Sequence, residues 1–262
     1  MGCLKLNYYY PERTEYRNTG AVEKQDLPLF FYVSQNGGFQ YVYCLGNPLI
    51  LKDPDGREVI VSGEESKAFF KEVKAGAKAL DISVKMDKNG KLSAQYKGKG
   101  EISENGAKFM EAVNDKTVTV NVNAIKHREG SATDFMFGGM FGGNSVYGET
   151  IDGSWTSQYA IANQTVIPSE LKSMDNAYGR PGQTSLHEIT EAHIGGKIAM
   201  REGVSSTGTG RNSYAFTEAH GRAIPQSGNI NRGTFSDRIG SWIEWQTVTN
   251  PIKLLKSTNI RP

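Results

Sequence analysis

Residues 183–200 read QTSLHEITEAHIGGKIAM, and this run of apolar, small and polar side chains predicts one long helix. His187 and Glu191 are four positions apart, so they share a helix face, because four steps of about 100° return almost to the starting direction. Glu188 follows His187 directly. His193 stands six positions after His187, about 240° round the helix, and therefore points elsewhere. The helix thus presents one histidine and two carboxylates close together.

Histidine and carboxylate side chains in this arrangement are typical of the active sites of zinc hydrolases. Such a site needs two or three converging histidine or carboxylate ligands, an open coordination position for water, and a carboxylate that takes a proton from water. We expect His187 and Glu191 as zinc ligands and Glu188 as the general base, its place in a His-Glu-x-x-His helix. Glu191 replaces the second histidine there, which carboxylate chemistry tolerates. The same short pattern also occurs on ordinary solvated helix faces, so a purely structural interpretation stays open.

The third ligand has to come from elsewhere in the chain, which has 4 histidines. His220 lies on a second expected helix among small and apolar residues, and we choose it as the third ligand. Glu218 on the same helix is the weaker alternative, whereas His127 lies in a charged, polar stretch. In peptide hydrolysis Glu188 would pass its proton to the leaving amine. Whether Tyr214 or an arginine assists at the developing negative charge is left open.

Length, charge and cysteine content narrow the class of protein. A chain of 262 residues suits one large domain with or without a smaller one, and a net charge of +2 gives no electrostatic case for nucleic acid or membrane as partner. Cys3 and Cys44, the 2 cysteines, form no metal-binding cluster and no disulfide framework. We recognise no signal peptide and no apolar run near the roughly 20 residues of a membrane span. Localisation is left undetermined, and we read Met1 as the start of a fragment.

Strand and helix patterns give residues 58–126 an α/β character, and we expect an α+β fold for the chain. The expected strands are 38–43, 58–61, 82–86, 92–96, 116–122 and 157–167. The expected helices are 64–80, 105–113 with Ser103 as N-cap, 183–200 and 212–223. The strand at 157–167 could border the cleft and hold an extended substrate by β-addition.

Two further stretches carry expectations about order and burial. Residues 137–143 read FGGMFGG, which we interpret as too flexible for a regular element, either a mobile lid over a site or an ordinary loop. In the tail, Trp242, Ile243 and Trp245 are expected to be buried. The small residues of the long helix (Ala192, Gly195, Gly196 and Ala199) suit close packing against a neighbour.

Residues 41–49 (YVYCLGNPL), followed by 53–56 (DPDG), resemble the closing segment of the RHS-repeat core. That family ends its shell with a tyrosine-rich strand, an Asn-Pro turn and an Asp-Pro-x-Gly boundary. Sequence after the boundary is a variable C-terminal module, often a toxin or effector domain. The resemblance covers about a fifth of the chain and implies an RHS-type tail segment at 1–57 and the module at 58–262.

The module 58–262 resembles the zincin metallopeptidase-like domains found at such C-termini. They combine an α/β lead-in, an edge strand, a His-Glu helix and a later Ala-His-x-x-Ala element, which residues 219–223 (AHGRA) match. The resemblance supports His220 and implies a mixed sheet with an active-site helix and Zn2+ as cofactor. It also implies a protein or peptide substrate, an immunity protein as partner, and export within a larger effector. The expected function is a zinc-dependent peptidase of effector or toxin type. A catalytically silent zincin-like binding module and a metal-dependent amidase acting on non-protein amides are the alternatives.

Overall fold

The structure is a computed structural model that describes residues 32–35, 38–41, 59–129, 131–151, 154–206 and 214–260. The chain divides into two compact units, Met1–Asp55 and Gly56–Pro262. The described part of the first unit is an antiparallel hairpin of β1 (Tyr32–Gln35) and β2 (Gly38–Tyr41). The strand expected at 38–43 is found over its first four residues. The Asn-Pro and Asp-Pro-x-Gly turns, and both cysteines, lie outside the described residues.

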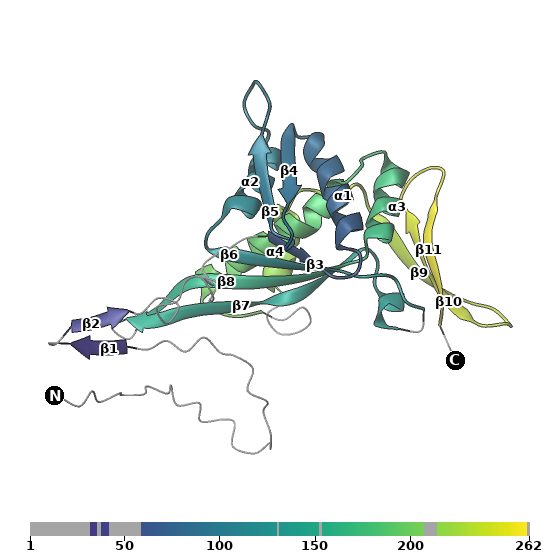
Figure 1. The fold of residues 1–262 in the computed structure, drawn as a ribbon. Helices are drawn as coiled ribbons and strands as arrows, with labels where there is room; N and C mark the ends of the chain where they lie inside the picture. The colour runs from purple at the N-terminus through teal and green to yellow at the C-terminus, as the bar shows by residue number, and fades with distance from the viewer. Residues whose placement is uncertain are drawn as a thin grey trace, which may run out of the picture. The chain divides into compact units, whose positions relative to one another are not determined.

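The second unit is an α+β structure built on a mixed four-stranded sheet (Figure 1). Its strands lie in the order β3 (Val59–Ser62), β6 (Val118–Ala124), β8 (Ser154–Val166) and β7 (Gly139–Ile151). The first three are parallel, and β7 pairs antiparallel with β8 at the end of the sheet. The α+β class with a mixed sheet, expected from the sequence, is therefore confirmed.

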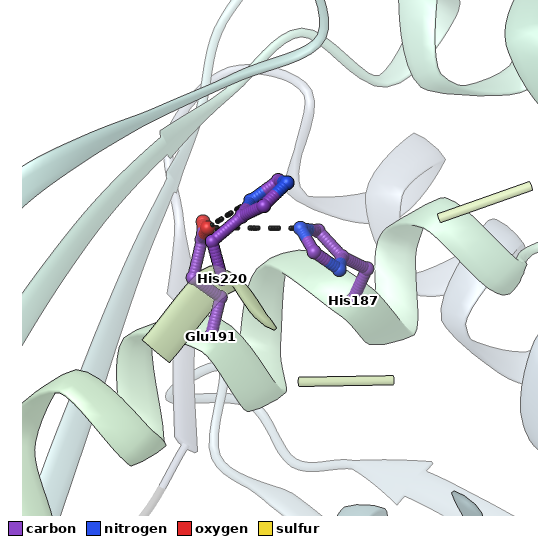
Figure 2. A group of neighbouring side chains, drawn as sticks. All are labelled: His187, Glu191 and His220. Atoms are coloured by element: carbon purple, nitrogen blue, oxygen red, sulfur yellow. Dashed lines mark hydrogen bonds and ion pairs between the residues drawn. The ribbon is translucent and has the colours of Figure 1, made fainter. Parts of the chain in front are cut away.

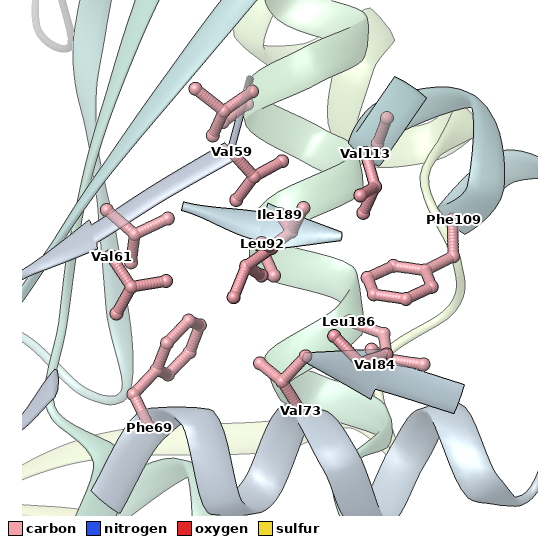
Figure 3. Packing of buried hydrophobic residues seen from close by; sticks show 14 of the residues in the cluster. Val59, Val61, Phe69, Val73, Val84, Leu92, Phe109, Val113, Leu186 and Ile189 are labelled. Carbon is pink, nitrogen blue, oxygen red and sulfur yellow. The ribbon is translucent and has the colours of Figure 1, made fainter. Parts of the chain in front are cut away.

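Helix α4 (Gln183–Glu202) packs on the sheet and contacts β6, β7 and β8 as well as neighbouring helices. Gly196 permits this approach, since a Cβ there would lie 2.6 Å from Val118 Cγ1 of β6. Figure 3 shows apolar side chains filling the core around α4, among them Ile189 of α4 itself. Burial of each such large side chain contributes about 1.5–3 kcal/mol. No described helix, α4 included, is both long and apolar enough to cross a membrane.

Elements that depend on short-range signals lie where the sequence predicts them. The hairpin of β4 (Ile82–Met86) and β5 (Leu92–Tyr96) has the expected bounds. Helix α1 (Ser66–Lys78) falls within the expected range. Helix α2 (Glu104–Asn114) begins after Ser103, whose side chain accepts a hydrogen bond from the Gly106 N–H at 3.2 Å. Capping and turn chemistry account for α2 and the hairpin, whereas α1 has no side-chain cap and follows from its apolar spacing.

Helix α3 (Pro168–Tyr178) was not expected from the sequence. Proline stands in its first turn and Gly179 ends it with a φ of 68°, a left-handed conformation that favours glycine. Asp175 of α3 is fully buried, and its Oδ1 accepts hydrogen bonds from the Thr184 N–H at 3.1 Å and the Thr184 hydroxyl at 2.5 Å. A carboxylate in that position stabilises the N-terminus of α4. Helix α3 therefore fixes where α4 begins.

Most of the glycine-rich stretch 137–143 is regular strand, so the expectation of a segment too flexible for a regular element is wrong for residues 139–143. From Gly139 onward it belongs to β7, whose pairing with β8 continues to Ile151 with irregularities at 141–143 and 147–148. Cross-strand hydrogen bonds order the backbone, and bulges accommodate the glycines. The strand expected at 157–167 is confirmed as β8, and its residues 160–166 are paired on both sides, with β6 and β7. This part of β8 therefore has no free edge for β-addition.

A second sheet follows α5 (Tyr214–Arg222) and consists of β9 (Ile230–Ser236), β10 (Ser241–Thr247) and β11 (Leu254–Ile260), with β10 in the centre. Ile243 and Trp245 are buried as expected. Trp242 is only half-buried, because successive strand residues face opposite sides, and it stacks on Phe235 with 5.9 Å between ring centroids. The expectation of a buried Trp242 is therefore wrong.

Lys256 of β11 joins this second sheet to the segment before β7. Its Nζ lies 2.9 Å from Glu170 Oε1 and donates hydrogen bonds of 2.7 Å to the carbonyl oxygens of Thr133 and Met136. Glu170 Oε2 in turn accepts the N–H of Gly138 at 2.8 Å. Because both charged side chains are buried, they compensate each other and fix the chain where β7 begins.

Candidate functional site

Helices α4 and α5 bring together the three residues proposed as metal ligands (Figure 2). His187 and Glu191 point from one face of α4, and His220 reaches them from α5. One ligand atom from each residue lies within 4.8 Å of the other two. His187 and Glu191 are buried, whereas 47% of the His220 side chain is exposed. The cluster therefore has a buried base and one side that faces solvent.

His187 has its ring orientation fixed by the backbone. Its Nδ1 donates to the carbonyl oxygen of Ile224 at 2.6 Å, since a carbonyl can only accept. Its Nε2 is buried, has no hydrogen-bond partner among the described residues, and lies 3.7 Å from Glu191 Oε1. A histidine held through one nitrogen, with the other aimed at a carboxylate and a second histidine, suits a metal ligand. The residues present therefore fit a bound cation.

Glu191 lies between the two histidines. Its Oε1 is 2.6 Å from His220 Nδ1. Burial alone would raise the pKa of Glu191, but the contacts with His187 and His220 lower it below its usual value. For His187, burial alone would lower the pKa, but the neighbouring carboxylates of Glu191 and Glu188 raise it. Without a metal the cluster is held together by the contacts of the Glu191 carboxylate with both imidazole rings, and a cation could take over that role.

Glu188 lies on the same helix but is held by the sheet. Gln164 of β8 donates a hydrogen bond from its Nε2 to Glu188 Oε2, and both side chains are buried. On the other side is Gly139 of β7, where an added Cβ would lie 1.9 Å from Glu188 Oε2. Burial and the charge of Glu191 raise the pKa of Glu188 to about 7. Such a carboxyl group can take up and release a proton near neutral pH.

A cavity of about 220 Å3 opens beside these groups. Glu188, Glu191 and His220 contribute to its lining. The rest of its lining comes from Phe137 just before β7, from Gly139, Met140 and Phe141 at the start of β7, from Phe216 of α5 and from Gln226. The cavity thus joins the candidate ligands and the raised-pKa carboxyl group to the outer strand of the sheet.

The geometry of this cluster is the basis for assigning a function to the chain. No protein-family model, curated protein or solved structure matches the chain. The function proposed for the chain accordingly rests on three features: the ligand cluster, the carboxyl group of Glu188, and the cavity with its bordering strand.

The raised pKa of Glu188 predicts a pH-dependent difference between the metal-free protein and its Glu188→Gln variant. Because the pKa of Glu188 is higher in the folded protein than its unfolded value of 4.5, protonated Glu188 stabilises the folded state at low pH. This contribution is complete below pH 4.5 and is lost as the pH rises through about 7. Glutamine does not titrate, so the stability of the variant does not fall for this reason. We therefore expect its unfolding free energy relative to wild type to rise by about 2–3 kcal/mol between pH 4.5 and 8. Urea unfolding with chelator present measures it, and a difference that does not change with pH would show that Glu188 is not desolvated.

His193 is turned away from the cluster, as its position on the helix predicts. It is buried, and its Nε2 lies 2.8 Å from Asp115 Oδ2. Burial alone would raise the pKa of Asp115, but hydrogen bonds from His193, Thr117 and Lys197 hold it far below its usual range. Asp115, His193 and Glu111 lie close enough to hold an ion. Because the ammonium group of Lys197 already lies 3.0 Å from Asp115 Oδ2, we interpret this group as a structural ion pair.

The other candidate residues lie away from the ligand cluster. Glu218 of α5 is paired with Arg201 at 3.3 Å and Arg222 at 2.8 Å. His127 lies between Asp134 and Glu170, 3.3 and 3.5 Å away, near Lys256. The side chain of Tyr214 is outside the described residues, and no arginine is among the described residues that line the cavity.

The sequence interpretation missed two residues of the site, Gln164 and Gly139. Gln164 belongs to the strand expected at 157–167, and the inward direction of alternate strand residues could have marked it as buried and polar. Gly139 carried no such signal, because its role depends on the close approach of β7 to α4.

Proposed function

We propose that the Gly56–Pro262 unit is a zinc-dependent peptidase with a zincin-like fold. The observation that carries the proposal is the buried Nε2 of His187, which faces Glu191 and His220 without a hydrogen-bond partner among the described residues. Two histidines and one carboxylate are a ligand set of catalytic zinc sites, which leave a further coordination position open. The exposed side of His220 gives that position access to the cavity.

In the proposed reaction the protein supplies proton transfer and orientation. When bound, zinc supplies a Lewis acid that polarises a carbonyl group and favours the ionisation of water. Glu188 takes the proton at its carboxylate and delivers it to the amine that leaves. Gln164 keeps the carboxylate in place through its hydrogen bond, and Gly139 leaves room for it. His187 keeps its orientation through the carbonyl oxygen of Ile224.

Strand β7, rather than β8, is the edge that an extended peptide could join. The main-chain groups of Val166 and Ala160 in β8 bond toward the β6 side, to Ile125 and Thr117. By alternation Gln164 also faces β6, so Phe141, which lies opposite Gln164, directs its N–H and C=O outward. Farther along, Asn144 already pairs on that outer side with Ser206. The start of β7, beside the cavity, is therefore the segment suited to β-addition, and this favours an extended peptide substrate.

The biological setting remains part of the proposal. We place the unit in an effector or toxin, with an immunity protein as partner, because residues 41–56 resemble the closing segment of the RHS core. Cleavage of peptides but not of small cell-wall amides would favour the peptidase over the amidase.

Zinc uptake is the first test of this function. The chain, stripped with a chelator and dialysed against zinc at neutral pH, should hold about one ion per chain, because one set of three ligands is available beside the cavity. Elemental analysis by mass spectrometry gives the stoichiometry. A protein that takes up no zinc under these conditions would rule out the metallopeptidase and favour a silent binding module.

A further inference from the structure

A second cavity, of about 520 Å3, lies beside α1 and β4 and shares no described residue with the candidate ligand cluster. Figure 1 shows this helix and this strand next to each other. Four lysines line the cavity, two from α1, one from β4 and one just after β5: Lys74, Lys78, Lys85 and Lys97. Asp81 is the only acidic residue among the described residues of this lining. We call this cavity the lysine groove.

The positive charge of the lysine groove is not neutralised by neighbouring carboxylates. Residues 66–99 contain nine lysines, no arginine and three acidic residues, whereas the whole chain has a net charge of only +2. All four lysines of the groove are exposed, and none of them forms an ion pair with a carboxylate in the described part of the chain. Glu72 of α1 is paired with Lys172 instead, at 3.6 Å. The groove therefore concentrates cations that can pair with a negatively charged ligand.

Strand β4 contributes a free main-chain edge to this groove. Among the described strands it pairs only with β5. The N–H of Lys97 donates to the carbonyl oxygen of Asp81 at 2.7 Å, so Asp81 directs its main-chain groups toward the β5 side. Because alternate residues of an antiparallel strand face opposite sides, Ile82 and Val84 direct their N–H and C=O groups away from β5. The side chains of Ile82 and Val84 are buried, so their main chain is the part that borders the groove.

Lysines flank this edge on both faces of the hairpin. The side chain of Val84 is buried in the core cluster that also contains Val73 of α1. Lys74 and Lys78 of α1 therefore lie on the face of the hairpin that meets the core. Lys85 follows Val84 in β4 and points to the opposite face. A strand added to β4 would alternate its side chains between these two faces, and each face offers ammonium groups.

The chemistry of the groove favours an acidic peptide over a phosphate-bearing ligand. A free strand edge offers both N–H donors and C=O acceptors, which an extended peptide satisfies and a phosphate group, an acceptor only, does not. The end of α1 that carries Lys78 is its C-terminus, so α1 presents no helix N-terminus to a phosphate there. Among the described residues of the lining there is no arginine to bind phosphate in a bidentate manner and no aromatic ring to stack on a base.

We propose that the lysine groove binds an extended acidic segment of a partner protein, which adds as a strand to the free edge of β4 and pairs its carboxylates with the four lysines. Main-chain hydrogen bonds to Ile82 and Val84 fix the register of the added strand, and the ammonium groups select acidic side chains. The surface is separate from the candidate zinc site, so the proposal does not depend on the peptidase function.

The test measures peptide binding to the full chain by fluorescence anisotropy in a low-salt buffer. The probe is a capped, fluorescein-labelled octapeptide of glutamate, threonine and valine with four glutamates. One comparison peptide has glutamines in place of the glutamates, and another carries N-methyl groups on its four central amides. We expect the acidic peptide to bind about tenfold more tightly than either, because the ion pairs and the edge hydrogen bonds both contribute. Added salt should weaken its binding.

A double variant, Lys74→Gln with Lys78→Gln, removes the two charges that α1 contributes. It should bind the acidic peptide about fivefold more weakly than wild type, and it should fold normally because both side chains are exposed. Lys108→Gln with Lys126→Gln is the matched control. It removes the same charge at two lysines outside the groove lining and should bind within about twofold of wild type.

Each outcome of these measurements supports or overturns the proposal. Equal binding of the acidic and glutamine peptides, or an equal loss in the control variant, would overturn it, and the lysines would then only protect a strand edge. Unimpaired binding of the N-methylated peptide would contradict strand addition. Displacement of the acidic peptide by inorganic pyrophosphate or by a single-stranded oligonucleotide would assign the groove to a phosphate-bearing ligand. Zinc uptake and peptide cleavage should not change in Lys74→Gln with Lys78→Gln, so failure of the peptidase leaves this site standing, and the reverse.

Discussion

Replacement of His220 by alanine is expected to lower the zinc affinity of the chain by at least about 100-fold. Loss of a residue that only supports a metal ligand already costs about 10–100-fold, and His220 is proposed as a direct ligand. Because half of its side chain is exposed, the stability of the metal-free protein should change by less than about 1 kcal/mol. Competition with a chromophoric zinc chelator measures the affinity, and thermal unfolding with chelator present measures the stability.

The matched control is His193→Ala, which removes the same side chain from the opposite face of α4. Zinc affinity should stay within about threefold of wild type, because His193 is bonded to Asp115 and is not part of the cluster. Stability should fall by about 3 kcal/mol, because a buried polar pair is broken. If His193→Ala removes the metal and His220→Ala does not, the group of Glu111, Asp115 and His193 is the metal site instead.

The Glu188→Gln variant should keep its zinc and lose about 1,000-fold in kcat for peptide cleavage. Glutamine has nearly the same shape and cannot accept the proton, and proton transfer by a positioned side chain contributes about 100- to 10,000-fold. The substitution leaves the proposed ligands untouched, so zinc per chain should remain that of wild type. Cleavage of the best peptide, with zinc content measured on the same sample, gives both values.

Glu218→Gln provides the control for the loss of a glutamate. It alters an exposed ion-paired residue of α5, so neither kcat nor zinc content should change by more than about twofold. Loss of zinc in Glu188→Gln would mean that Glu188 is a ligand and that the general base lies elsewhere. Loss of zinc in Glu218→Gln would instead support the weaker alternative for the third ligand.

The parts of the fold that could be predicted depend on neighbouring residues. The cap of α2 at Ser103 and the turn between β4 and β5 are encoded within a few positions, and the structure has them where expected. Helix α3 had similar signals in Pro168 and Gly179, which the sequence interpretation overlooked. Strand β7 was different, because its glycines suggest disorder in isolation and its order comes from pairing with β8.

The residues of the candidate site also fall into those that local sequence predicts and those that depend on contacts between distant elements. His187, Glu188 and Glu191 follow from spacing on one helix, and His220 from its place on the next helix. Gln164 and Gly139 lie next to Glu188 only because strands β8 and β7 pack against α4. Strand alternation could have marked Gln164 as buried and polar. The contacts that both residues make with Glu188 join elements far apart in sequence, so these contacts required the structure.

The contacts of Lys256 limit how far the chain can be shortened for expression. A truncated version ending after α5 would keep all three proposed ligands and the helix that carries Glu188. It would also lose Lys256, leave the buried carboxylate of Glu170 without that cation, and release the carbonyl groups of Thr133 and Met136. The residues just before β7 would then lack their anchor, and Phe137 its stacking partner Trp245. A minimal piece that keeps the proposed site intact must therefore extend through β11, although no described residue of that strand lines the cavity.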